Sequence, residues 1–116
     1  EKLVNIFKNL PGNIFCTTSE DYMKMDYISE DLVELLGYSR SELFELYNGS
    51  ISRLMVDISA TDIQEMIEEN ISKDKEIKIT YKLKTKRGKI MSVEDNRKII
   101  KRADGGISTV AKYTVV

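Results

Sequence analysis

Residues 77–84 read Ile-Lys-Ile-Thr-Tyr-Lys-Leu-Lys, an alternation of apolar and polar side chains that decides the class of fold. A period of two predicts a β-strand with one buried face and one solvated face. A second strand is predicted at residues 90–100, and Ala-Asp-Gly-Gly at 103–106 predicts a hairpin connection into a third strand at 107–116. In the second strand, the apolar side chains that share a register are Met91, Val93 and Ile99. The last third of the chain therefore predicts three consecutive antiparallel strands.

Helical periodicity precedes these strands. The apolar face of the longest predicted helix holds Ile63, Met66, Ile67 and Ile71, and Ser59 precedes it as a candidate cap. Ser39 and Glu42 have the spacing of a capping box, in which each side chain satisfies a free amide at the start of a helix. Ser29 can cap another helix that ends at Gly37. The middle of the chain therefore predicts three helices.

The N-terminal part predicts one short helix and two strands. Residues 2–10 carry an apolar stripe at helical spacing, which stops at Pro11-Gly12, and residues 14–18 and 24–28 predict a pair of antiparallel strands. The complete order is helix, two strands, three helices, three strands. This order predicts an α+β fold, in which a five-stranded antiparallel sheet carries the helices on one face and a short helix flanks it at the N-terminus.

The size of the chain fits one domain, because 116 residues bury a single core. Because the chain begins at Glu1 and not at Met, we expect it to be a piece of a longer protein, with residues 1–11 as a flanking helix and 12–116 as the core. Cys16 is the only cysteine, so nothing requires an oxidising compartment, and we expect a cytoplasmic location. No apolar stretch approaches the roughly 18 residues of a membrane span, which argues against direct membrane insertion.

The sequence lacks the residue types of most catalytic and metal sites. It contains no histidine, which removes His-ligated haem, the Ser-His-Asp triad and His-based zinc sites. Adjacent carboxylates such as Glu94 and Asp95 do not face each other on a strand, so we interpret them as solvated surface. We therefore predict no catalytic residue and no metal site, and a small enzyme that uses carboxylates stays as a remote alternative.

Charge is distributed unevenly along the chain. Residues 20–69 carry 13 acidic and 3 basic side chains, whereas residues 73–102 carry 12 basic and 4 acidic ones. The lysines of the first predicted strand and its turn are Lys78, Lys82, Lys84 and Lys86. Tyr81 points to the other face of that strand, so no aromatic platform accompanies the lysines, and we expect a solvated surface and no nucleic-acid partner.

Several local strings resemble the PAS family of sensory domains. They are Asn-Leu-Pro-Gly-Asn-Ile-Phe at residues 9–15, Leu-Leu-Gly-Tyr-Ser-Arg-Ser-Glu-Leu at 35–43, and Tyr-Lys-Leu-Lys-Thr-Lys-Arg-Gly at 81–88. Each string is short, but their order and spacing match the PAS fold over about residues 2–114. The resemblance implies a non-catalytic regulatory module of bacterial-type signalling, in two-component or cyclic-di-GMP pathways. Its linked effector would be an enzyme such as a diguanylate cyclase or a histidine kinase.

The resemblance also implies a small-ligand pocket between the sheet and the helices. The side chains it places inward are Ile14, Cys16, Met25, Tyr27, Tyr38, Ile67, Ile79, Tyr81, Thr109 and Ala111. Among them, the tyrosines at 27, 38 and 81 are the strongest candidates, because an inward hydroxyl group needs a partner. Haem and flavin are not expected, because histidine is absent and Cys16 lies on a strand, whereas light-sensing relatives use a cysteine on a helix.

Two functions remain open from the sequence. The first is a sensor that binds a small ligand or partner and modulates its effector. The second is a purely structural dimerisation or protein-interaction module without a ligand. In either case we expect a homodimer, formed through the apolar stripe Leu3, Ile6, Phe7 and Leu10.

Overall fold

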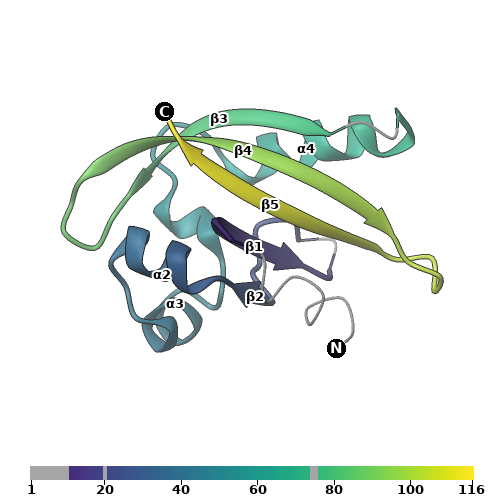
Figure 1. Ribbon diagram of the computed structural model, residues 1–116. Helices are drawn as coiled ribbons and strands as arrows, with labels where there is room; N and C mark the ends of the chain where they lie inside the picture. Colours follow the sequence, from purple (N-terminus) through teal and green to yellow (C-terminus); the bar gives the residue numbers. More distant parts are fainter. Residues whose placement is uncertain (1–10, 20, 74–75) are drawn as a thin grey trace.

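The computed structural model describes residues 11–19, 21–73 and 76–116. Within them, one five-stranded antiparallel sheet runs in the order β2-β1-β5-β4-β3 (Figure 1). Its strands are β1 (Asn13–Thr17), β2 (Tyr27–Ile28), β3 (Ile77–Lys84), β4 (Ile90–Lys101) and β5 (Ile107–Val115). The first and second strands of the chain therefore extend the sheet formed by the last three.

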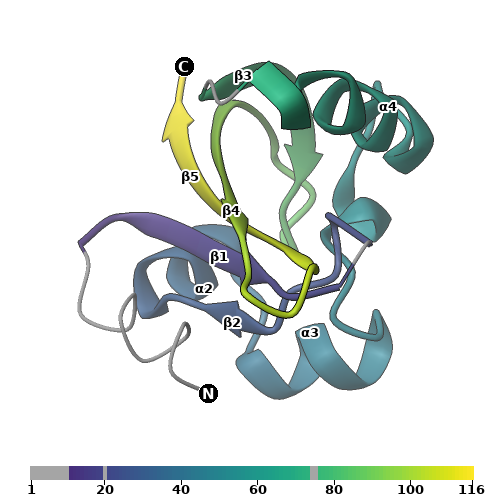
Figure 2. The ribbon, with the colours of Figure 1, turned by 90° about the vertical axis from the view of Figure 1, so that its right-hand side faces the viewer.

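The helices α2 (Glu30–Leu36), α3 (Arg40–Leu46) and α4 (Ala60–Asn70) lie between β2 and β3 in the chain. Two 3-10 turns, η1 (Ile51–Leu54) and η2 (Ile71–Lys73), accompany them. The buried side chains of all three α-helices belong to one apolar cluster with the inner face of the sheet. Figure 2 shows this arrangement as a curved sheet with the helices on one side. The predicted α+β architecture is confirmed.

The predicted caps begin the helices where the sequence places them. The Ser29 side chain accepts a hydrogen bond from the backbone N–H of Leu32 at the start of α2. Ser39 and Ser59 each form a capping box, with Glu42 and Asp62 as the third helical residues. Each box satisfies two amides that the helix itself leaves free, which defines the first turn.

The second strand is shorter than predicted. Only its last two residues pair with β1, and Lys24 instead forms an isolated bridge with Ser50. Met25 does not pair with β1, because its N–H donates to the carbonyl of Gly49. Asp26 rejoins the end of β1, since its N–H donates to the Cys16 carbonyl and its carboxylate accepts from the N–H and hydroxyl of Thr18. Residues 21–26 therefore form an irregular connection before β2.

Residues 1–10, with the proposed dimerisation side chains Leu3, Ile6, Phe7 and Leu10, lie outside the described residues. Among the helices that the structure does describe, none has the length and apolar character needed to cross a membrane.

Candidate functional site

β4 carries an ion pair into the interior. Along this strand buried positions alternate with partly exposed ones, and Asp95 and Arg97 occupy two buried positions after Met91 and Val93. Both charged side chains are 0% exposed, and Arg97 Nη2 lies 2.7 Å from Asp95 Oδ2. The interpretation of Asp95 as solvated surface is therefore wrong, because its register places it against the helices.

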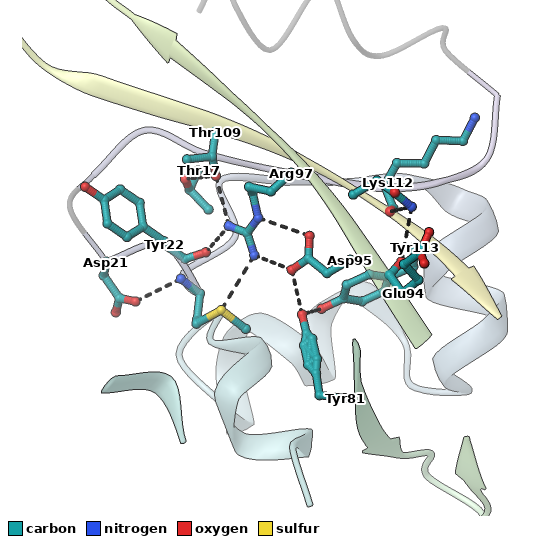
Figure 3. A network of polar contacts seen from close by, with 12 residues as sticks. Thr17, Asp21, Tyr22, Tyr81, Glu94, Asp95, Arg97, Thr109, Lys112 and Tyr113 are labelled. Carbon is teal, nitrogen blue, oxygen red and sulfur yellow. Dashed lines mark hydrogen bonds and ion pairs between the residues drawn. The ribbon is translucent and has the colours of Figure 1, made fainter. Parts of the chain in front are cut away.

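The Arg97 guanidinium is surrounded by acceptors from several elements (Figure 3). Its Nε donates to Asp95 Oδ1 at 3.2 Å and its Nη2 donates to Oδ2 at 2.7 Å. Nη1 donates to the Tyr22 carbonyl at 2.5 Å and to Thr109 Oγ1 at 3.0 Å. Nη2 also faces the sulfur of Met23 at 3.7 Å. One side chain thus connects β4 and β5 with the irregular connection before β2.

Two tyrosines extend the network on the carboxylate side. The Tyr81 hydroxyl donates to Asp95 Oδ2 at 2.8 Å, and the hydroxyl groups of Tyr81 and Tyr113 lie 2.6 Å apart. Burial raises the pKa of both tyrosines above its ordinary value, and the Asp95 charge raises it further. Because both hydroxyl groups stay protonated, Tyr113 can donate to Tyr81 while Tyr81 donates to the carboxylate.

The charge of Arg97 is retained despite its burial. Burial alone would lower the pKa of the guanidinium, but the charge and hydrogen bonds of Asp95 outweigh that effect and raise it above the ordinary value. The ring of Phe15 lies 4.9 Å from the guanidinium carbon, close enough for a cation–π contact. Within the described residues, no buried side-chain nitrogen or oxygen lacks a hydrogen-bond partner. The network is therefore electrically neutral and internally satisfied.

The interior brings together six of the ten predicted pocket residues. Five of them belong to or line the apolar cluster, and Thr109 contacts Arg97 and also lies 2.7 Å from the Thr17 hydroxyl. Ala111, which is 0% exposed, pairs across strands with Arg97 on one side and Phe15 on the other. The six residues are Met25, Ile67, Ile79, Tyr81, Thr109 and Ala111. They come from β3, β5, α4 and the connection before β2.

Tyr38 lies at the edge of this interior. It is partly buried against the main cluster, and its ring meets that of Tyr47 edge to face at 5.3 Å. The Tyr47 hydroxyl donates to the Tyr38 hydroxyl at 3.2 Å. The hydroxyl of Tyr38 thus finds its partner in another partly buried tyrosine and not in the Arg97 network.

The inward placement of Ile14, Cys16 and Tyr27 is wrong. These side chains form a separate cluster with Val110 on the opposite face of the sheet. The residue of β1 that faces the helices is Phe15, whose ring packs edge to face against Tyr113 at 5.4 Å. Because successive side chains of a strand point to opposite faces, assigning Phe15 inward moves both neighbours outward.

The sequence interpretation missed Asp95, Arg97 and Tyr113. The signal that marks the first two was present, because they continue the two-residue register of Met91 and Val93 toward Ile99. Charged residues at inward positions of a strand indicate a paired interior site.

The lysines that were predicted to be solvated are exposed in the structure. Lys78, Lys82 and Lys84 are exposed on β3, and Lys86 in the turn pairs with Glu42 at 2.7 Å. Elsewhere in the described part of the chain, no group of three or more histidine, cysteine or carboxylate side chains is placed to hold a metal ion.

Comparisons with known proteins agree with this architecture. The sequence model of the PAS fold family matches residues 25–114. Among curated proteins, none matches the chain significantly. A PAS domain of an HTR-like protein from Haloarcula marismortui has 23% identity and a TM-score of 0.71, covering 99% of this chain and 95% of that one.

Two further solved structures show the same fold at lower identity. The PAS domain of a two-component sensor histidine kinase has 14% identity and a TM-score of 0.68, with 99% of this chain and 94% of that one covered. Drosophila melanogaster Cycle PAS-B with bound ethylene glycol has 14% identity and a TM-score of 0.71, with 90% and 99% covered.

Proposed function

The chain belongs to the PAS fold family, and from this premise we propose that it is a sensory module that binds a small ligand between its sheet and helices and modulates a linked effector. The observation that carries the proposal is the Arg97–Asp95 pair, buried on the inner face of the sheet. Apolar side chains of similar volume often stabilise a core as well as a buried ion pair does. A charged pair in this position therefore favours a role in recognition over a role in stability alone.

The network offers a route from the interior to the end of the domain. Arg97 holds the carbonyl of Tyr22, whereas Asp95 holds Tyr81 and through it Tyr113, two residues before the end of β5. A ligand that alters the hydrogen bonds of Arg97 would change the relative stability of two packings of these elements. β5 would then pass the change to an effector such as a diguanylate cyclase or a histidine kinase.

Two structural neighbours support the proposed small ligand and the proposed signalling effector. One structural neighbour is the PAS domain of a sensor histidine kinase, and Cycle PAS-B is described with bound ethylene glycol, a small polar molecule. We extend both properties to this chain as proposals, together with a homodimeric state, a cytoplasmic location and a bacterial signalling context.

A structural dimerisation or protein-interaction module is the rival function. The observation that favours it is the complete hydrogen bonding of the buried polar side chains in the described residues. An interior that satisfies itself needs no ligand. In that case the Arg97 network would only fix the packing of the sheet against residues 21–26.

Thermal unfolding with a panel of metabolites separates the two functions. A ligand at 100 times its Kd stabilises the folded state by about 2.7 kcal/mol, which raises Tm by on the order of 10 °C in a domain of this size. We expect at least one metabolite to produce a saturable shift. If no compound in a broad panel shifts Tm, the dimerisation module becomes the better description.

Ala111→Leu is the variant that locates the ligand. Ala111 lies between Arg97 and Phe15, so a leucine there would occupy the space beside the guanidinium, at a cost of about 1–3 kcal/mol in a packed interior. We expect the variant to lose the metabolite-induced shift in Tm. A variant that keeps the full shift would show that the ligand binds elsewhere.

A further inference from the structure

We propose that the Arg97 N–H facing Met23 is the binding position for the carbonyl oxygen of the ligand, and that the Met23 side chain is the group this ligand displaces. The inference rests on the proposed function and specifies its ligand class. That class is a small neutral molecule, in which a carbonyl oxygen is joined to an apolar part of about the size of the methionine side chain.

The hydrogen bonds of Arg97 identify the position. A guanidinium has five N–H donors, and here four of them meet oxygen atoms of Asp95, Tyr22 and Thr109 at 2.5–3.2 Å. The fifth, on Nη2, meets only the thioether sulfur of Met23 at 3.7 Å. Sulfur is a weak acceptor, whereas bonds from a charged donor to oxygen are among the strongest in proteins. An oxygen atom in place of the sulfur would therefore improve the one poor contact of this buried cation.

A change of rotamer at Met23 would leave the hydrogen bonds of its backbone in place. Its backbone is held at both ends, because its N–H donates to Asp21 Oδ1 at 3.1 Å and its carbonyl accepts from the Ile51 N–H at 2.9 Å. The side chain itself is unbranched and flexible. Met23 also lies in the irregular connection between β1 and β2, which no strand ladder constrains at this residue. Because Met23 is 1% exposed within the apolar cluster, its displacement needs a change of rotamer together with a shift of the side chains packed around it.

The charges around the position favour a neutral ligand. Asp95 already neutralises Arg97, with both carboxylate oxygens engaged by the same guanidinium. A ligand carboxylate on Nη2 would place a second negative charge beside Asp95 in an interior shielded from water, where like charges repel strongly. The Phe15 ring, 4.9 Å from the guanidinium carbon, adds an apolar wall. A neutral carbonyl group with an apolar substituent fits both features.

Three small probes of similar shape test this assignment on the whole chain. They are acetone, which carries a neutral carbonyl, acetate, which is its anionic counterpart, and dimethyl sulfide, which carries a thioether and no oxygen. Binding is followed by NMR at the Arg97 side-chain Nε–H and at the methyl groups of the methionines. We expect acetone to shift the Arg97 and Met23 signals saturably and to bind at least about ten-fold more tightly than acetate or dimethyl sulfide.

Variants of Met23 test the displacement. Met23→Ala removes the competing side chain and should tighten acetone binding about ten-fold, as expected if the open rotamer is populated at about one-tenth in the native protein. Met23→Leu keeps a comparable volume on a stiffer side chain and should weaken it. Met66→Ala on the exposed part of α4 is the matched control and should leave binding unchanged. Should the alanine variant fail to fold, the comparison of the leucine variant with the native chain decides alone.

The outcomes separate this inference from the proposed function. Equal binding of acetone and dimethyl sulfide, or no response at Arg97 and Met23, overturns the inference. If metabolites shift Tm through Ala111 while these signals stay unchanged, the sensory function stands and the assignment to Met23 is wrong. If acetone binds at Arg97 as described and no metabolite alters a linked effector, the subsite stands and the sensory function fails.

Discussion

Removing Asp95 should cost a large part of the stability of the domain. Its carboxylate accepts three hydrogen bonds, two from Arg97 and one from Tyr81, and the side chains of the ion pair are 0% exposed, so water does not screen their interaction. Breaking a buried pair by removing one partner costs about 3–5 kcal/mol, because an unpaired charge remains inside. Since domains are stable by only about 5–15 kcal/mol, Asp95→Ala should lose roughly a fifth or more of the total.

Urea unfolding followed by circular dichroism measures this loss, with two comparisons. Asp95→Ala combined with Arg97→Met removes both charges and should recover much of the stability, because no unpaired charge is left. Glu30→Ala removes the partner of Arg40 in a pair whose carboxylate is 77% exposed, and should cost less than about 1 kcal/mol. The reasoning fails if Asp95→Ala costs no more than Glu30→Ala, or if the double variant is as unstable as the single one.

Three further predictions follow from individual side chains. Burial, with a smaller contribution from the nearby Asp26 charge, raises the pKa of the Cys16 thiol to about 11. Thiol reagents at pH 8 should therefore label Cys16 at least about 100-fold more slowly in the folded chain than in the urea-unfolded chain, and rapid labelling of the folded chain would contradict this. The pKa of Tyr113 in the folded chain lies above its unfolded value of about 10, so the stabilisation it contributes is present below pH 10 and is lost as the pH rises further. Tyr113→Phe should reduce the loss of unfolding free energy at alkaline pH, measured by urea unfolding, and an unchanged pH profile would refute this. Ser39→Ala should cost about 1 kcal/mol by the same measurement, whereas Ser50→Ala, at a helix start without a side-chain cap, should cost less.

The helices and the long strands were predictable because local chemistry determines them. Ser39 with Glu42 satisfies the free amides of a helix start, and no tertiary contact is needed to recognise that spacing. Likewise, the alternation over residues 77–84 fixes which side chains of β3 are buried, since its polar positions are all lysine or threonine. In both segments the local preference and the tertiary environment agree.

The face assignment of β1 was not predictable from periodicity. Ile14, Phe15 and Cys16 are all apolar and all buried, and the polar residues Asn13 and Thr17 share the phase of Phe15, so the local pattern favours the wrong face. The assignment depends on pairing with β5, where Phe15 lies opposite Ala111. That pairing joins residues nearly one hundred positions apart, which no local pattern encodes.

The interior site was hidden for a different reason. Asp95 and Arg97 stand in a strand whose neighbours Glu94 and Lys98 are also charged, so the composition of the segment indicates a solvated strand. Only the two-residue register of Met91 and Val93 places Asp95 and Arg97 on the inner face. A buried charge is stable only when it has a partner, and the sequence does not show which groups pair with these two residues. One of these partners, the Tyr22 carbonyl, lies 75 residues earlier in the chain, so no local pattern reveals it.

The same ion pair sets the energetic condition that any sensory role must meet. A buried ion pair with all its hydrogen bonds formed resists change, because breaking one bond leaves a buried polar group without a partner, which costs free energy that ligand binding would have to supply. The contact between Arg97 and Met23 is the exception, since a ligand oxygen there gains a bond while the four bonds to oxygen persist. A signal that enters at this contact therefore displaces the buried Met23 side chain, and it reaches Asp95, Tyr81 and Tyr113 through hydrogen bonds that remain intact.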